Sequence, residues 1–238
     1  MISLKNINVY VSEKQILKNI NFDFEEEKLY ALMGPNGSGK STLANILMGH
    51  PAYKIKSGKI FLGGEEITDL PVEKRAQKGI FLSFQQPLSL TGVNVFQLLR
   101  LALSGKKDPL ALKKEIEVLA KKLKIKKELI ERSLNDGASG GEKKKMEVLQ
   151  AAVLEPKFLI FDEVDTGVDV DALKTIASFI ADFKIGRTIL VITHYNRILR
   201  YLKPDKVLVM INGEIKKVGD YQLAEEIEKE GYEKEVKS

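Results

Sequence analysis

The chain alternates between two kinds of hydrophobic pattern. Short runs of consecutive apolar residues predict buried β-strands, whereas apolar residues that recur every three or four positions predict amphipathic helices. Patterns of the first kind predict strands at residues 2–9, 16–24, 29–33, 59–62, 80–84, 158–161, 188–192 and 206–210. The later strands alternate with helical stretches near residues 171–183 and 195–202, which is typical of a parallel sheet covered by helices.

Two pairs of strands are predicted to be antiparallel. Only the polar segment 12–15 separates residues 2–9 from residues 16–24, which indicates a hairpin-like pair. The dipeptide Asn212-Gly213 is a two-residue turn signal between apolar runs at 207–211 and 215–218. The chain then ends in a charged amphipathic stretch, residues 221–237, which predicts a helix.

A helical block interrupts this order. Between residues 86 and 150 the period becomes helical, with helices predicted at 95–103, 110–123 and 128–134. The pattern therefore predicts a single domain, 1–238, with an α/β core formed by residues 1–85 and 151–238 and an inserted helical subdomain formed by residues 86–150.

Composition supports a globular chain and excludes several chemistries. Of 238 residues, 44% are hydrophobic and 30% are charged. The apolar runs are far shorter than the roughly 20 residues that span a membrane, and no leader pattern precedes them, so we expect no membrane insertion and a cytoplasmic location. The chain has no cysteine, which excludes disulfides, thiol catalysis and iron–sulfur ligation by its own thiolates.

The chain is also moderately basic. Its 38 basic and 33 acidic residues give a net charge of +5. The lysines are spread over several helices and accompany no nucleic-acid-binding motif, so we interpret the surplus as a solvated surface and expect no nucleic-acid partner.

A glycine-rich loop follows the predicted strand at 29–33 and opens a helix. Its glycines allow backbone N–H groups to surround a phosphate, its lysine adds a positive charge, and its serine hydroxyl reaches Mg²⁺. This order predicts a nucleoside triphosphate site with Mg²⁺. The residues of the loop are Gly34, Pro35, Asn36, Gly37, Ser38, Gly39, Lys40, Ser41 and Thr42.

Polar residues end three of the predicted strands. Asp162 and Glu163 follow the run at 158–161, Gln85 follows 80–84, and His194 lies just after 188–192. Because the carboxyl ends of parallel strands share one edge of a sheet, we expect all of them beside the glycine loop. Asp162, with Ser41 and Gln85, is then a candidate Mg²⁺ ligand. Glu163, His194 and Gln85 are candidate catalytic residues around an attacking water.

A fourth motif, Ser139-Gly140-Gly141-Glu142, precedes a lysine-rich helix. Ser139 and Glu142 have the spacing of a capping box, which is a purely structural interpretation. The same glycine-flanked helix start also offers N–H groups to an anion. The two interpretations are compatible, and the motif alone does not identify whose phosphate it binds.

Together the motifs resemble the ATP-binding-cassette superfamily over essentially the whole chain, in the family's order. The resemblance implies a P-loop NTPase fold of the cassette type, with an antiparallel β subdomain and an inserted helical subdomain. It also implies ATP and Mg²⁺, and two copies that sandwich ATP, with Ser139, Gly140, Gly141 and Glu142 acting on the partner's nucleotide. By the same resemblance the segment 166–169 is the D-loop, and the loop that carries Gln85 is the Q-loop.

Within this superfamily the sequence is similar to the SufC branch, the ATPases of the SUF iron–sulfur cluster assembly system. The similar segments include 79–85, 149–156, 169–174 and 193–199. This resemblance implies SufB and SufD scaffold proteins as partners. The superfamily's adenine-stacking aromatic aligns with Val11 and not with Tyr10, so either the strand carries a bulge that turns Tyr10, or adenine contacts Val11.

Two other functions compete with this interpretation. The chain can instead be the ATP-binding subunit of a transporter, which shares every catalytic residue and differs in its partner. A nucleic-acid-associated cassette usually carries two cassettes or a long coiled-coil insertion, and this chain has one cassette and no such insertion. A salt-dependent affinity for DNA or RNA would revive that alternative.

Overall fold

The computed structural model describes residues 2–232, and its centre is a six-stranded sheet. The strands lie in the order β10-β9-β3-β8-β7-β6, and all neighbours are parallel except β9 and β10. Their bounds are β3 Leu29–Met33, β6 Ile80–Leu82, β7 Phe158–Asp162, β8 Thr188–Ile192, β9 Lys206–Ile211 and β10 Glu214–Gly219. The predicted parallel sheet and the predicted turn at Asn212-Gly213 are confirmed.

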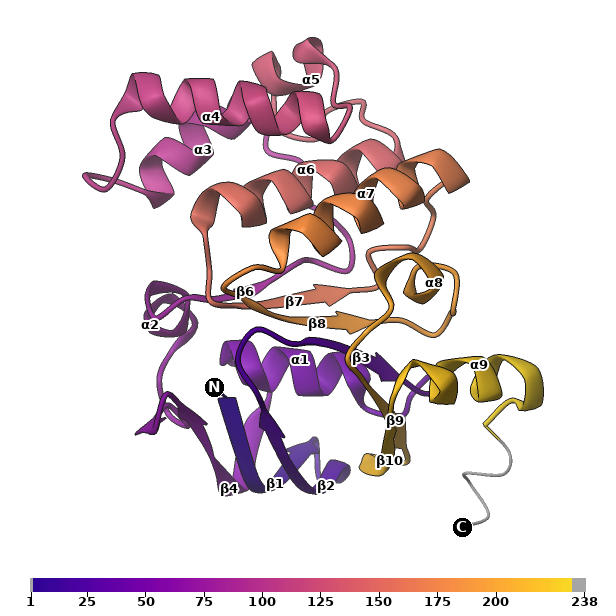
Figure 1. The fold of residues 1–238 in the computed structure, drawn as a ribbon. Coiled ribbons are helices and arrows are strands. Elements are labelled where there is room, and N and C mark those ends of the chain that lie inside the picture. Colours follow the sequence, from indigo (N-terminus) through magenta and orange to yellow (C-terminus); the bar gives the residue numbers. More distant parts are fainter. Residues whose placement is uncertain (1, 233–238) are drawn as a thin grey trace.

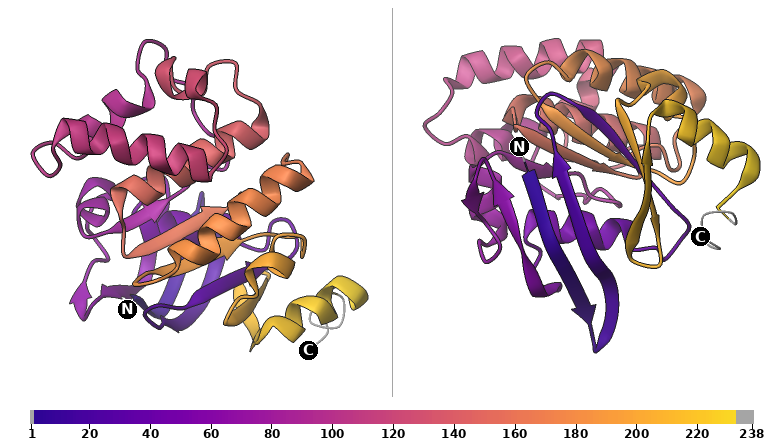
Figure 2. Two further views of the ribbon diagram at one scale, coloured as in Figure 1. Left: turned by 45° about the horizontal axis from the view of Figure 1, so that its top comes forward. Right: turned by 60° about the horizontal axis from the view of Figure 1, so that its bottom comes forward.

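A second, antiparallel sheet lies beside the first. It has the order β2-β1-β4-β5, with β1 Ile2–Val11, β2 Lys14–Phe24, β4 Lys54–Leu62 and β5 Glu65–Glu66. The predicted pairing of the first two strands is confirmed by the register from Ile2 opposite Phe24 to Val11 opposite Lys14. In Figure 2 this hairpin, in indigo, extends away from the parallel sheet.

Helices occupy both faces of the parallel sheet (Figure 1). Helix α1 packs between the two sheets, while α6 and α7 cover the opposite face and α3 to α5 form an outer layer above them. The helices are α1 Lys40–Met48, α2 Val72–Gln77, α3 Val95–Ala102, α4 Pro109–Lys122, α5 Lys127–Glu131, α6 Gly140–Leu154, α7 Val170–Phe183, α8 Leu199–Leu202 and α9 Tyr221–Glu230.

Strand β3 shows why the molecule has two hydrophobic cores. Successive side chains of a strand point to opposite faces, so a strand buried on both faces is apolar throughout. Leu29, Ala31 and Met33 join the core beneath α6 and α7. Tyr30 and Leu32 join the core that contains α1 and the antiparallel sheet.

Several predicted elements are shorter in the structure. The helix predicted at 195–202 is reduced to α8, because the Thr193 hydroxyl accepts from Tyr195 N at 3.0 Å and closes a local turn. The helix predicted at 128–134 ends at Glu131, since Leu134 N donates to Val93 O at 2.8 Å. Strand β6 ends at Leu82 and not at 84.

Other boundaries also differ from the predictions. Strand β4 begins at Lys54 rather than at 59, and the short elements β5 and α2 were not predicted. Of the helix predicted at 221–237, α9 accounts for Tyr221–Glu230, and residues 233–237 lie outside the described residues. The proposed division between residues 150 and 151 falls inside α6, so it does not coincide with the end of an element.

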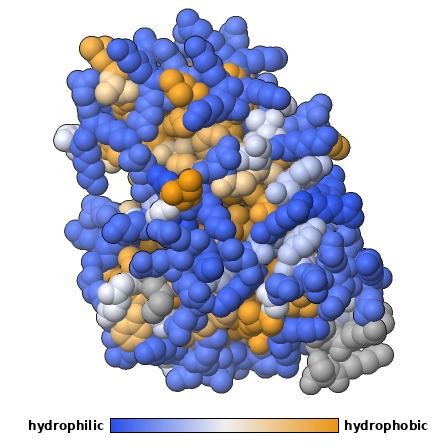
Figure 3. Space-filling model, in the orientation of Figure 1, coloured by the Kyte–Doolittle hydropathy of each residue, from blue (hydrophilic) through white to orange (hydrophobic). Residues whose placement is uncertain are grey.

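The surface is mostly polar. On the face drawn in Figure 3, hydrophilic side chains cover most of the surface, and smaller apolar areas show between them. Within residues 2–232, every helix is too short or too polar to cross a lipid bilayer.

Candidate functional site

The glycine loop joins β3 to α1. Gly39 has φ 107° and directly precedes α1, a conformation that glycine adopts without steric cost. At Gly34, a Cβ atom would lie 2.1 Å from Met210 O and 2.8 Å from Ser38 Oγ, so a larger residue does not fit. The loop therefore needs glycine at these points for its path, and the path leaves the start of α1 facing outward from the sheet edge.

Lys40 is folded back onto this loop. Its Nζ donates to Gly34 O at 2.8 Å and to Pro35 O at 3.0 Å. Burial lowers the pKa of Lys40, and the negative charges of Glu163 and Asp162 oppose that shift. The ammonium group is thus desolvated, close to two acidic residues, and held by two backbone carbonyls that a phosphate oxygen can replace.

Asp162 ends β7 and lies beside Ser41. Burial raises the pKa of Asp162, while a hydrogen bond with the Ser41 side chain lowers it. One carboxylate oxygen, Oδ1, is buried without a hydrogen-bond partner among the described residues. Hydroxyl and carboxylate oxygens are the ligands that Mg²⁺ prefers, so this pair fits the ion.

Glu163 is placed by an unusual backbone conformation. Its φ is 51°, in the left-handed region that residues other than glycine rarely adopt and that is often found at functional sites. Glu163 N donates to Ile192 O at 2.9 Å, and its carbonyl accepts from Thr166 N at 3.2 Å. The chain therefore turns sharply after β7, and this turn directs the carboxylate toward the sheet edge.

Gln85 and His194 contact the Glu163 carboxylate from two sides. Gln85 Nε2 donates to Glu163 Oε2 at 3.2 Å. His194 Nδ1 lies 3.4 Å from Glu163 Oε1, although this approach lacks hydrogen-bond geometry. The His194 ring also packs on that of Tyr195, with centroids 3.8 Å apart. The structure thus brings together all three predicted catalytic residues, from three separate strand ends.

The motif Ser139-Gly140-Gly141-Glu142, which corresponds to the signature motif of the cassette family, is capped as the spacing predicts, with Ser139 and Gly140 exposed and Gly141 buried. Ser139 Oγ accepts from Glu142 N at 3.3 Å, and Ser139 N donates to Glu142 Oε2 at 2.9 Å. The hydrogen bond from Ser139 N lowers the pKa of Glu142. A Cβ atom on Gly140 would lie 2.9 Å from Gly167 O, so the motif packs directly against the D-loop of the same chain.

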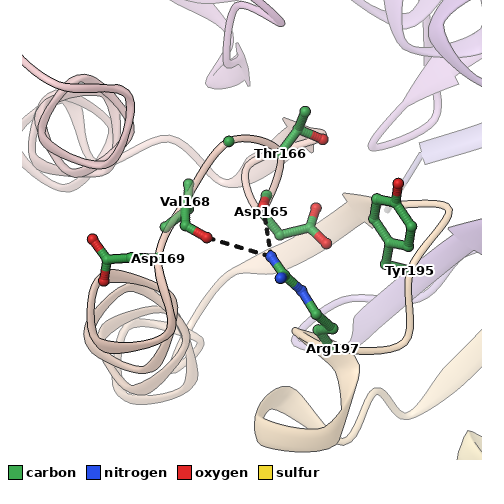
Figure 4. A pocket seen from close by; sticks show the side chains of 7 residues that line it. Asp165, Thr166, Val168, Asp169, Tyr195 and Arg197 are labelled. Carbon is green, nitrogen blue, oxygen red and sulfur yellow. Dashed lines mark hydrogen bonds between the residues drawn. The ribbon is translucent and has the colours of Figure 1, made fainter.

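The D-loop is also tied to the segment that carries His194 (Figure 4). Arg197 Nη2 donates to the carbonyls of Asp165 and Val168 at 3.3 and 3.4 Å. The Asp165 carboxylate is buried and accepts from the Thr193 hydroxyl at 2.9 Å, and burial raises the pKa of Asp165. These contacts join the D-loop and the His194 segment into one connected edge.

The strand expected to contact adenine carries an irregularity. The pairing of β1 with β2 shifts register between Val9 and Tyr10. The Lys56 ammonium lies 4.6 Å from the centroid of the Tyr10 ring. The extra residue at this shift lies on β2, between the partners Leu17 and Gln15, so the shift is not the bulge in β1 that would turn Tyr10.

Sequence reasoning missed the residues that support this site. They are polar side chains that bond to the backbone or to other residues of the site, and all except the exposed Arg197 are buried: Ser83, Lys144, Glu147, Asp165, Thr193 and Arg197. The sequence pattern could have revealed one pair, because the charged residues Lys144 and Glu147 interrupt the apolar side of α6 near Val148 and Leu149. The other residues give no pattern that distinguishes them from ordinary polar residues.

Comparisons with known proteins agree with this geometry. The sequence model of the family described as ABC transporter matches residues 17–166. A protein of Antithamnion sp. named probable ATP-dependent transporter ycf16 is 42% identical over 98% of this chain and 96% of its own length. Vegetative protein 296 of Bacillus subtilis is 40% identical over 98% of this chain and 92% of its own length.

Solved structures share the fold. The ADP conformation of the ATP-binding cassette MJ1267 has a TM-score of 0.81 and 25% identity, covering 100% of this chain and 97% of that one. The dimeric post-hydrolysis structure of MJ0796 bound to ADP and Pi has a TM-score of 0.81, with 93% and 99% coverage, and at 22% identity it supports the fold alone. The predicted fold class is confirmed. This chain belongs to the ABC transporter family, as one of its ATP-hydrolysing cassettes.

Proposed function

We propose that this ATPase is the energising subunit of the SUF iron–sulfur cluster assembly machinery, and that ATP drives its dimerisation and conformational change in a SufB/SufD scaffold. The observation that supports the catalytic part best is the Glu163 carboxylate, which lies between Gln85 and His194 near the Lys40 ammonium. Phosphoryl transfer needs mainly positioning and charge neutralisation, and this edge of the sheet supplies both.

The glycine loop binds the phosphates in this proposal. Gly34 to Thr42 surround them with backbone N–H groups, and Lys40 exchanges its two carbonyl partners for phosphate oxygens. Ser41 and Asp162 would hold Mg²⁺, joined by the amide oxygen of Gln85, since the Gln85–Glu163 hydrogen bond uses only the amide nitrogen. The ion supplies neutralisation of charge on the phosphate oxygens.

Glu163 prepares the attacking water. Its carboxylate orients the water and accepts its proton, because it is the acidic group at the edge that is not committed to Mg²⁺. Gln85 donates to one oxygen of the carboxylate, and His194 lies near the other. His194 also reaches the terminal phosphate, as its position at the end of β8 allows.

The signature motif acts on a second copy in this proposal. Ser139, Gly140, Gly141 and Glu142 are at the start of α6, where Ser139 and Gly140 are exposed and the N–H groups of a helix favour an anion. The solved MJ0796 cassette is described as a dimer. By analogy, ATP held by the glycine loop of one copy contacts the signature motif of the other.

The SUF assignment is supported by sequence features of the signature region and of the His194 segment. The signature reads Ser139-Gly140-Gly141-Glu142 followed by three lysines, and the later segment 193–199 is similar to the SufC branch. The absence of cysteine suits a subunit that supplies motion and no cluster ligands.

The alternative is the ATP-binding subunit of an ABC transporter, and the names of several relatives favour it. A Streptococcus pyogenes protein that is 41% identical over 98% of this chain is named probable ABC transporter ATP-binding protein. Affinity purification from the source cell, followed by identification of the bound proteins, separates the two. Soluble SufB- and SufD-like proteins support the SUF assignment, and an integral membrane permease contradicts it.

The role of Glu163 is tested by Glu163→Gln. This variant keeps the shape of the side chain but loses its proton-accepting charge, so it should bind ATP, hydrolyse it at least about a hundredfold more slowly, and accumulate as a dimer. Size-exclusion chromatography with and without Mg²⁺-ATP, together with phosphate release, measures these effects. A variant that stays monomeric with ATP and hydrolyses it at the normal rate would overturn the assignment.

A further inference from the structure

A buried ion pair lies on α6, one turn after the signature motif. Lys144 and Glu147 are 3% and 4% exposed, and Lys144 Nζ lies 3.4 Å from Glu147 Oε2. Removing two charges from water costs several kcal/mol per ion, and a single contact of this length does not offset it. Further hydrogen bonds must therefore hold both charged groups in place.

Those hydrogen bonds go to the backbone of the Q-loop. Lys144 Nζ donates to Phe84 O at 2.9 Å and to Gln85 O at 3.0 Å. Glu147 Oε1 accepts from Phe84 N at 2.7 Å. The ammonium group of Lys144 thus donates to two carbonyls, and the carboxylate of Glu147 accepts from one N–H group. Each charged group therefore bonds to backbone groups of the opposite partial charge.

The backbone held in this way carries Gln85, which donates to Glu163. On its other side the segment is tied to β7, because Ser83 Oγ accepts from Asp162 N at 3.0 Å and Ser83 N donates to Ile160 O at 2.9 Å. The Q-loop backbone thus runs between the strand that carries the acidic pair and the helix that carries the signature motif.

We infer that Lys144 and Glu147 are positioning residues, which hold the Q-loop backbone so that Gln85 orients Glu163 and which carry movements of the signature helix to that carboxylate. This inference rests on the roles proposed above for Gln85 and Glu163. It assigns the pair a part in turnover and not in ATP binding, because the hydrogen bonds of both side chains go to the Q-loop backbone and to each other, and not to the glycine loop.

The test compares neighbouring lysines on the same helix. Lys144→Met removes the group that donates to the Q-loop carbonyls, and Glu147→Leu removes the group that accepts from Phe84 N. Lys145→Met is the matched control because Lys145 is partly exposed. We expect kcat to fall about tenfold or more in both test variants, with the Kd for Mg²⁺-ATP within about threefold of the wild type. The control should keep the wild-type kcat.

A conservative variant separates positioning from simple stabilisation. Glu147→Gln keeps an oxygen acceptor for Phe84 N, so it should restore kcat to within about threefold of the wild type even where its thermal stability is reduced. It also serves as the test variant should Glu147→Leu fail to fold. Equal kcat values for Glu147→Leu and Glu147→Gln, both close to wild type, would contradict the inference.

A spectroscopic measurement follows the Q-loop without using turnover. The chain has no tryptophan, and the Phe84 side chain is 59% exposed, so Phe84→Trp introduces a single fluorescent reporter. In that background, Lys144→Met should raise the acrylamide quenching constant about twofold because the loop backbone is released, and Lys145→Met should not. Identical quenching in the two variants would overturn the inference.

Running Glu163→Gln in parallel keeps the two hypotheses apart. Normal hydrolysis by Glu163→Gln means that the proposed site is wrong, whatever the lysine variants do. Loss of hydrolysis in Glu163→Gln, combined with wild-type kcat and unchanged quenching in Lys144→Met, means that only the positioning role is wrong.

Discussion

The acidic residues of this site have pKa values that their surroundings shift in different directions. Burial raises the pKa of Asp162 and of Asp165, so the fold disfavours their charged forms. The pKa of Glu142 is lowered instead, because its carboxylate accepts the Ser139 N–H. A depressed carboxylate pKa stabilises the fold above the unfolded-state pKa, and this stabilisation is lost as the pH falls through the folded-state pKa.

The charge of Glu142 is tested by Glu142→Gln. The amide can still accept from Ser139 N but carries no charge at the start of α6, so the variant should be less stable by about 0.5 kcal/mol near pH 7, a small figure because the group is partly exposed. The deficit should vanish in acid, below the folded-state pKa of Glu142. Urea unfolding of the nucleotide-free protein at several pH values measures it.

The control for this prediction is Glu117→Gln, which removes an exposed carboxylate from the middle of α4. It should show no comparable loss. A Glu142→Gln deficit that is the same at neutral and acid pH would mean that the side chain acts through its shape alone.

Buried polar side chains also join elements of the fold. Arg75 of α2 is 1% exposed and donates to Ile46 O at 2.6 Å and to Leu47 O at 3.0 Å, near the end of α1. It also donates to Leu70 O and Thr68 O at 2.9 and 2.7 Å. The last carbonyls of a helix lack partners within it, so Arg75 completes α1, the helix that begins at the glycine loop.

Arg75→Met should therefore destabilise the protein strongly. The substitution leaves buried carbonyls without donors, and we expect a loss of about 3 kcal/mol in the free energy of unfolding. Arg100→Met, which changes an exposed arginine in the last turn of α3, should cost less than about 0.5 kcal/mol. Denaturant titrations of both variants measure the difference, and similar midpoints would refute the role of Arg75.

At the scale of the whole molecule, the residues of the site all lie at one edge of the parallel sheet. The glycine loop follows β3, the Q-loop follows β6, the acidic pair lies at the end of β7 and His194 follows β8, and these strands are all parallel. Their carboxyl ends therefore meet, as in other open α/β sheets. A nucleotide bound there contacts segments that are more than a hundred residues apart in the chain, such as Lys40 and Asp162.

ATP should consequently stabilise the whole fold. A ligand that binds only the native state at about 100 times its Kd adds about 2.7 kcal/mol to the free energy of unfolding. The Glu163→Gln protein, which retains ATP, should show this as a higher midpoint of thermal unfolding. Lys40→Ala should show almost none, because the loop has lost the cation that faces the phosphates. An equal shift in Lys40→Ala would mean that the phosphate site has been misidentified.

Much of this architecture can be predicted from local patterns in the sequence. The strands at 29–33, 158–161 and 188–192 are continuous apolar runs, and the glycine loop, the acidic pair and the capping box have recognisable spacings. These signals are readable because each depends on neighbouring residues: backbone hydrogen bonding sets the period, and close phosphate approach demands glycine. The helix predicted at 195–202 was too long, and only Leu199–Leu202 is helical, because Thr193 and Asn196 form bonds that a local pattern does not reveal.

The sequence by itself thus determined the chemistry of this chain: a phosphate-binding loop, acidic residues at strand ends and a capped signature helix. Only the tertiary structure decided how these groups face one another. The left-handed turn at Glu163, the contact of Gln85 with that carboxylate, and the Lys144–Glu147 pair that holds the Q-loop all join residues far apart in the chain. Burial of charge is tolerated only where distant backbone groups complete the hydrogen bonding, and that condition exists only after the chain has folded.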